Sequence, residues 1–173
     1  MASHAVFDFM VLNFRSWVTA CLEVVAVSLN ALERDSSATF VYSVAANLGS
    51  DKALNEMGCR FANGTGIAKD EGLAFSMWSA AAKAGNVVAY ANLGWAYFNG
   101  IGTAVNLPAA VEFYGRAADA GHLESMYNLG LLYADGIVVE RNLTEASKLF
   151  ATASSGGLKE AGEALGKIRS SPT

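Results

Sequence analysis

Apolar residues recur along this chain with the spacing of an α-helix, and the same spacing returns several times. In residues 89–100, Ala89, Leu93 and Tyr97 follow one another at intervals of four, which places them on one side of a helix. Matching segments occupy 53–64 and 125–136. No stretch alternates strictly between apolar and polar residues over the length of a strand. The pattern therefore predicts an all-helical protein.

A second set of helices is predicted between these segments, in 70–85, 106–121 and 142–157. Each opens on a residue whose side chain is a good N-cap, namely Asp70, Asn106 or Asn142. Each closes on a glycine, namely Gly85, Gly121 or Gly157. Glycine often ends a helix because it adopts the left-handed conformation without strain. One period of the chain thus contains two helices.

The period is 36 residues, since glycine, alanine and aromatic residues fall into columns when the chain is written in rows of that length. The columns include Gly58, Gly94, Gly130 and Gly166; Ala74, Ala110 and Ala146; and Trp78, Tyr114 and Phe150. A helix pair of this size cannot bury its apolar face alone. The repeats are therefore expected to stack into an α/α superhelix, or solenoid.

The glycine inside each first helix needs a physical reason, because glycine in a helix interior costs about 1 kcal/mol relative to alanine. We expect Gly94 and its equivalents Gly58 and Gly130 to lie where the second helix approaches closely. A side chain at these positions would block that approach. Gly100 is expected to end its helix as a left-handed cap.

The period divides the chain into consecutive segments. Residues 1–16 are predicted to form an apolar helical segment, and 17–52 a degenerate repeat without the first-helix glycines. Full repeats are predicted in 53–88, 89–124 and 125–160, followed by a capping helix in 161–173.

The N-terminal part is strongly apolar between residues 5 and 32. Three charged residues interrupt it, namely Asp8, Arg15 and Glu23. The longest run without a charge, 24–32, is far shorter than the roughly 18–20 residues that span a membrane. No basic stretch precedes it, so a secretory signal is not expected. We expect residues 1–37 to be helical and either to cover the open end of the stack or to be buried in a partner.

Charge and composition narrow the function classes. The net charge of −4 and the pI of about 5.1 give no general attraction to nucleic acid or to anionic lipid. Charged residues make up 16% of the chain, against roughly 25% in typical domains, and the mean hydropathy is +0.28. Either a partner covers part of the surface, or alanine and glycine raise the hydropathy without forming an exposed patch.

The sequence contains no motif for catalysis, for a cofactor or for a metal. Cys21 and Cys59 lack metal-ligand spacing. We expect them to be buried, reduced thiols, which favours a reducing intracellular or organellar compartment over secretion. His4 and His122 are isolated from each other and from carboxylate clusters. We therefore predict no cofactor, no metal site and no enzymatic activity.

Residues 89–124 carry the pattern A-x-x-x-L-G-x-x-Y-x-x-G, followed by a second helix that ends in A-A-x-x-G. The matching residues are Ala89, Leu93, Gly94, Tyr97, Gly100, Ala110, Ala118 and Gly121. This pattern resembles the Sel-one-like repeat family, a relative of the tetratricopeptide repeats. The neighbouring repeats depart from it at Met57, Phe61, Ser125 and Ser154. The resemblance covers about residues 38–170 and implies a right-handed superhelix that serves as an adaptor or assembly scaffold, without catalytic residues.

The candidate binding face is the side of the first helices opposite the Ala89–Leu93–Tyr97 stripe, which is concave in tetratricopeptide-like solenoids. The residues that we single out on it are Asn55, Trp95, Phe98, Asn99, Tyr127, Leu131 and Asp135. These positions are unusually apolar for a helix side that faces a groove. They predict an aromatic groove for an apolar segment of a partner. Alternatively, neighbouring first helices cover one another there.

The sequence thus predicts a non-catalytic protein–protein interaction scaffold or adaptor. Its partners are expected to be proteins, with no nucleic acid and no membrane span. A permanent peripheral subunit of a larger complex, including a membrane-associated one, is a related alternative. An enzyme that uses one cleft of the solenoid is the alternative from another class, and no cluster of titratable residues supports it.

Overall fold

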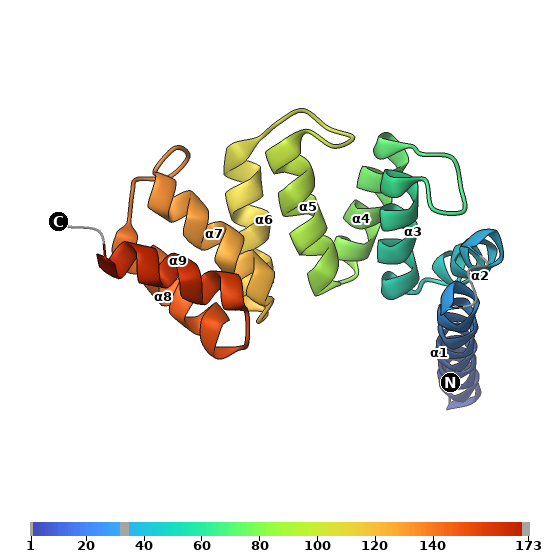
Figure 1. The fold of residues 1–173 in the computed structure, drawn as a ribbon. Helices are drawn as coiled ribbons and strands as arrows, with labels where there is room; N and C mark the ends of the chain where they lie inside the picture. Colours follow the sequence, from blue (N-terminus) through green and yellow to red (C-terminus); the bar gives the residue numbers. More distant parts are fainter. Residues whose placement is uncertain (1, 32–34, 171–173) are drawn as a thin grey trace. The chain divides into compact units, whose positions relative to one another are not determined.

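The computed structural model describes residues 2–31 and 35–170, and within these ranges every regular element is an α-helix (Figure 1). The predicted all-α repeat fold is confirmed. The helices are α1 (Ala2–Ala31), α2 (Asp35–Asn47), α3 (Asp51–Asn63), α4 (Glu71–Lys83), α5 (Val87–Asn99), α6 (Leu107–Asp119), α7 (Leu123–Asp135), α8 (Leu143–Ser155) and α9 (Lys159–Ser170). They form two compact units, one ending at Asn86 with α1–α4 and one beginning at Val87 with α5–α9.

The second helices of the repeats begin where their N-caps predict. In each of them the cap side chain accepts a hydrogen bond from the backbone N–H three residues later, which satisfies one of the open donors of the first turn. The pairs are Asp70 with Leu73 at 2.9 Å, Asn106 with Ala109 at 3.1 Å, and Asn142 with Glu145 at 2.9 Å.

The first helices begin two residues earlier than the apolar stripe predicts, because polar residues cap them there. The Ser50 side chain accepts from the backbone of Ala53 ahead of α3. The His122 Nδ1 atom accepts from the backbone of Ser125 ahead of α7. His122, which carries no motif in the sequence, therefore has a structural role as a helix cap.

The glycines inside the first helices lie against large side chains of the following helix, as predicted. A methyl group at Gly94 would lie 2.7 Å from the ring of Tyr114. The corresponding distances are 2.5 Å from Gly58 to Trp78 and 2.6 Å from Gly130 to Phe150. Ordinary carbon contacts are about 3.5–4.0 Å, so an aromatic ring occupies the volume that a side chain at the glycine would need. Each of the three full repeats thus has one glycine–aromatic pair where its two helices meet.

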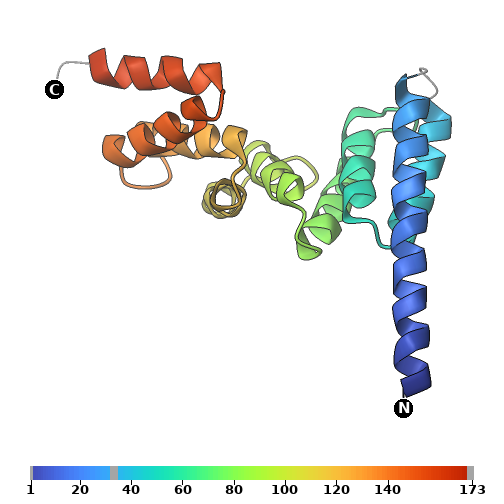
Figure 2. The same cartoon turned by 90° about the horizontal axis from the view of Figure 1, so that it is seen from below.

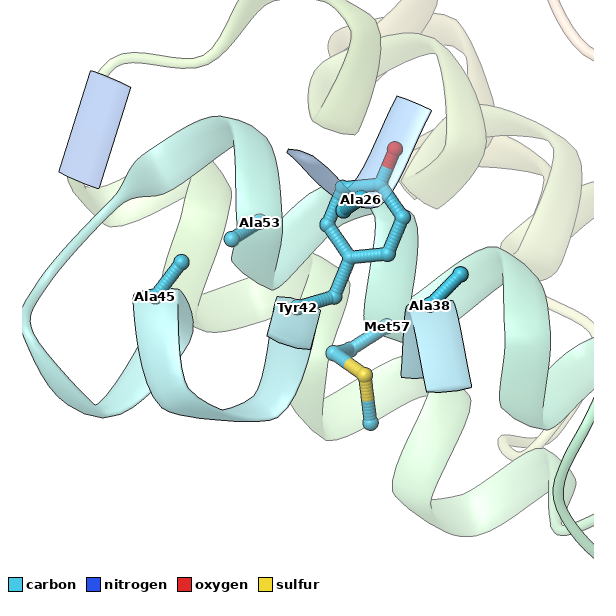
Figure 3. Packing of buried hydrophobic residues seen from close by; sticks show 6 residues of the cluster. All are labelled: Ala26, Ala38, Tyr42, Ala45, Ala53 and Met57. Carbon is cyan, nitrogen blue, oxygen red and sulfur yellow. The ribbon is translucent and has the colours of Figure 1, made fainter. Parts of the chain in front are cut away.

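The degenerate repeat has no such pair but buries its own apolar cluster. Ala26 of α1 packs with Ala38 and Tyr42 of α2, and with Ala53 and Met57 of α3 (Figure 3). Leu22 and Leu29 of α1 pack against the same cluster. The C-terminal half of α1 therefore takes the position of a first helix in this repeat, and it covers the end of the stack near Ala38–Tyr42 as expected.

A buried arginine of α3 connects this helix with α1 and α2. The Arg60 side chain is 2% exposed, and its guanidinium donates to the Thr39 hydroxyl at 2.7 Å and to the Asn30 side-chain oxygen. It also pairs with Glu56 at 3.2 Å and lies 5.0 Å from the centre of the Tyr42 ring. These partners replace most of the water that a buried guanidinium loses, while the buried Nε has the Glu56 carboxylate nearby without a hydrogen bond to it.

The described side chains near the middle of α1, among them Phe14 and Trp17, do not belong to the apolar core. Helix α1 continues without interruption through residues 16 and 17, where the sequence suggested a segment boundary. Figure 2 shows its N-terminal half extending beyond α2, α3 and α4. Phe14 and Trp17 are each 65% exposed. At Phe14 and Trp17, therefore, α1 does not cover the stack, and the alternative expectation, burial in a partner, stays a prediction. Parts of the predicted terminal segments and of the degenerate repeat (1, 32–34 and 171–173) lie outside the described residues.

The expectation of two buried thiols is wrong for one of them. Cys59 is half-buried on α3, whereas Cys21 is exposed on α1. Cys21 lies between the exposed residues Trp17 and Val24, on a side of α1 that the described residues of the first unit leave uncovered.

Candidate functional site

Helix α5 carries the most exposed part of the predicted groove. Trp95 and Phe98 are each 42% exposed, and Asn99 beside them is exposed as well. The Asn99 amide donates to the backbone oxygen of Trp95 at 3.0 Å. Ala89 and Leu93 lie on the opposite side of the helix and are buried. Helix α5 thus presents two aromatic side chains on the side that faces away from its core stripe.

The equivalent residues of α7 are partly covered. Tyr127 and Leu131 are half-buried, and they pack against the cluster that Phe150 of α8 and Ala161 of α9 belong to. The Tyr127 and Phe150 rings lie 5.7 Å apart, centre to centre. Asp135 is exposed at the last position of α7. On α7, therefore, the next first helix covers part of the predicted face.

A cavity of about 260 Å³ opens between α7, α8 and α9. Its lining residues are Tyr127, Leu131, Ala134, Phe150, Glu160, Glu163, Ala164, Lys167 and Ile168. The lining is mainly apolar, and the charged residues Glu160, Glu163 and Lys167 of α9 are exposed. The second unit thus contains a small apolar hollow with a charged edge.

The repeat period relates this hollow to the aromatic residues of α5. Leu131 and Ala134 are 36 positions after Trp95 and Phe98, and both line the hollow. The same side of α5 therefore carries Trp95 and Phe98. Asn55, the remaining predicted residue, is half-buried on α3 and belongs to the first unit.

The predictions from the sequence do not include the wall of the hollow that α9 forms. The sequence predicts only a capping helix in 161–173, whereas Glu160, Glu163 and Lys167 of α9 border the hollow. The 36-residue period could have revealed this, because Gly166 falls in the same column as the first-helix glycines and so marks α9 as a further first helix. Treated as a further first helix, α9 is expected to lie beside α7.

His, Cys, Asp and Glu side chains are scattered over the described residues. Among them, no three His, Cys, Asp or Glu side chains come together in a way that could hold a metal ion. Burial raises the pKa of Tyr114 to about 12, and a hydrogen bond with Asn128 acts in the opposite direction. This tyrosine belongs to the glycine–aromatic pair of its repeat, so its shift reflects core packing. No helix in the described ranges is long and apolar enough to cross a membrane.

The helix pairs, their period and their glycine–aromatic contacts correspond to a known repeat. The Sel1 repeat family matches residues 51–86, 87–122 and 123–158. The chain belongs to the Sel1 repeat family. Sel1 repeat proteins generally mediate protein–protein interactions and are typically non-catalytic scaffolds.

Solved Sel1-type structures share this fold. One is a protective antigen of uropathogenic Escherichia coli strains that displays an SLR fold, with a TM-score of 0.81, 26% identity, and coverage of 87% of this chain and 33% of that one. Another is a Sel1 repeat protein from Oxalobacter formigenes, with a TM-score of 0.81 and 23% identity. The match covers 86% of this chain and 62% of that one. This chain therefore spans less than two thirds of either protein. The comparison with curated proteins gave no match.

Proposed function

We propose that this chain is a non-catalytic scaffold that binds an apolar segment of a partner protein along the first-helix face of its second unit. The exposed pair Trp95 and Phe98 is the observation that carries the proposal. Aromatic residues at the centre of an interface supply a disproportionate share of the binding energy. Two of them on the outer side of a helix whose inner side is core suit a contact with a partner better than internal packing.

The proposed contact extends from α5 to α7. Tyr127 and Leu131 supply half-buried apolar surface, while Asn99 and Asp135 supply polar groups at the helix ends. An asparagine side chain both donates and accepts hydrogen bonds, so it can contact an extended backbone. Asn55 is assigned to the corresponding face of α3, within the first unit.

The hollow beside α9 supports a protein partner over a small molecule. Its volume of about 260 Å³ lies below the roughly 300–1,000 Å³ of typical small-molecule sites. An apolar side chain of a partner fits such a space as an anchor. The edge of the hollow carries more negative than positive groups, because Glu160 and Glu163 supply two carboxylates and Lys167 one amine. This edge favours a partner segment with a basic residue beside its anchor.

The test begins with a pull-down on the full chain, followed by mass spectrometry of the retained proteins. The identified partner is then titrated against the wild type and Trp95→Ala by calorimetry. Truncating an aromatic hot spot costs about 2 kcal/mol or more, so we expect binding to weaken by roughly 30-fold. The melting temperature should change little, because Trp95 is 42% exposed.

Phe40→Ala is the matched control, since Phe40 is an exposed aromatic residue on α2 that the proposed face does not include. It should leave the affinity unchanged. If Trp95→Ala instead lowered the melting temperature strongly and left the affinity intact, Trp95 would be a core residue and the groove proposal would be wrong.

A permanent subunit of a larger complex is the second candidate, and the exposed apolar side of α1 favours it. Purification distinguishes the two. An obligate subunit aggregates when it is produced without its partner, whereas an adaptor remains dispersed.

A further inference from the structure

Helix α1 carries a continuous seam on its exposed side. The seam residues are Phe14, Trp17, Cys21, Val24, Ser28 and Ala31, and all of them are exposed. Their spacing alternates strictly between three and four positions, which is the a/d pattern of a coiled coil. The same spacing continues in the sequence to Met10 and Phe7. From Phe14 to Ala31, about two and a half heptads of apolar or small residues therefore follow one line along the helix.

The positions beside the seam are also apolar. Val27 and Val25 flank it at the positions where coiled coils commonly carry charges. They are 60% and 48% exposed, and Val24 within the seam is 67% exposed. Such side chains are normally buried, and an exposed apolar surface of this extent on one helix is typical of an interaction site.

The charged side chains of this part of α1 point to the other side of the helix. Arg15 and Glu23 line a cavity of about 400 Å³ together with Ser50, Asp51 and Lys52. The Ser50 hydroxyl donates to the Glu23 carboxylate. The seam side of residues 14–31 therefore contains no charged residue.

We propose that α1 pairs with α1 of a second copy of this chain, with Trp17 and Val24 at the centre of the contact. The heptad spacing supports another helix as the occupant, since a seam of this period fits a partner with the same period. The lack of flanking charges supports an identical copy. Charged flanks are what select a different partner helix in coiled coils, and an apolar strip is complementary to itself.

The geometry leaves room for such a contact. The N-terminal half of α1 extends beyond the rest of the first unit (Figure 2). Farther along the helix, Trp17 and Val24 are 65% and 67% exposed, so the described residues of the first unit leave the seam uncovered there. At 1.5 Å per residue, the 30 residues of α1 reach about 45 Å. A membrane surface is the less suitable occupant, because interfacial helices usually carry lysine and arginine toward the headgroups. Arg15 lines the cavity instead.

The test is sedimentation velocity of the full chain from about 1 to about 100 μM, because the dimer fraction depends on protomer concentration. We expect a species of twice the 18.1 kDa chain mass. Trp17→Glu and Val24→Glu should each weaken the dimer at least tenfold while leaving the helical circular dichroism spectrum unchanged. Phe40→Glu is the control, because Phe40 is 70% exposed on α2 and lies off the seam. It should leave the dimer intact.

Several outcomes would overturn the proposal. One is a wild-type chain that stays monomeric throughout this range. Another is an assembly that Phe40→Glu disrupts as strongly as Trp17→Glu does. A chain that aggregates until a different protein is co-produced would assign the seam to that protein. A monomer that floats with uncharged phosphatidylcholine vesicles and loses this binding on Trp17→Glu would assign it to a lipid surface.

Discussion

The packing of Gly94 against Tyr114 gives the sharpest test of how these repeats are held together. A methyl group at Gly94 would lie 2.7 Å from one ring carbon of Tyr114 and 2.9 Å from two more. Contacts of this kind are normally about 3.5–4.0 Å, so the ring would have to move by roughly 1 Å. Tyr114 is 4% exposed and has little space for such a shift.

The magnitude for Gly94→Ala combines two opposing effects. Overpacking a core contact typically costs about 1–3 kcal/mol, whereas replacing glycine by alanine inside a helix contributes about 1 kcal/mol of stability. We expect a net destabilisation of roughly 0–2 kcal/mol. Gly94→Leu should destabilise further, because it adds more atoms at the same contact.

Gly115→Ala is the matched control. Gly115 lies inside α6, next to Tyr114 in the chain, and a methyl group there would meet nothing within 4 Å. It should therefore stabilise the protein by about 0.5–1 kcal/mol. The difference between the two alanine variants isolates the contact with the ring, at about 1–3 kcal/mol.

The assay is thermal and urea unfolding followed by circular dichroism. A change of 1 kcal/mol shifts the melting temperature of a chain of this length by about 2–4 °C. In a Tyr114→Leu background the penalty of Gly94→Ala should shrink, because the clashing ring is absent. If Gly94→Ala were as stabilising as Gly115→Ala, the glycine would not be there for close packing.

Two further predictions concern buried polar groups. Burial raises the folded-state pKa of Tyr114 to about 12 from 10.0. The stabilising effect of Tyr114 is therefore complete below pH 10 and is lost as the pH rises towards 12, with a total loss of roughly 1–3 kcal/mol. The difference in melting temperature between wild type and Tyr114→Phe, followed from about pH 9 to about pH 12, should show this loss, and a constant difference would contradict it. Arg60→Lys should destabilise the first unit by about 1–3 kcal/mol, because an ammonium group cannot reach Thr39, Asn30 and Glu56 together as the guanidinium does. An unchanged free energy of unfolding in urea would contradict this.

Much of the fold could be read from the sequence because the relevant signals are local and repeated. The caps Asp70, Asn106 and Asn142 act on backbone groups three residues away, so their effect needs no tertiary context. The interior glycines are also readable, since a residue that costs helix stability in every repeat requires a packing reason. The period then predicts the helix pairs.

Tertiary structure decided which apolar side chains are covered. Ala26 and Trp17 both belong to the apolar pattern of α1, yet Ala26 packs against α2 while Trp17 has 65% of its surface exposed. Periodicity reveals which residues share one side of a helix, but whether another helix lies against that side depends on residues far away in the chain.

The candidate groove illustrates the same division. The sequence by itself placed Trp95 and Leu131 at equivalent positions, because a fixed period determines equivalence. The tertiary structure made them different, since α9 packs beside Leu131 and borders a hollow there, while Trp95 remains 42% exposed. Burial is a property of contacts between distant segments, so identical positions in a repeat acquire different surroundings when different helices pack beside them.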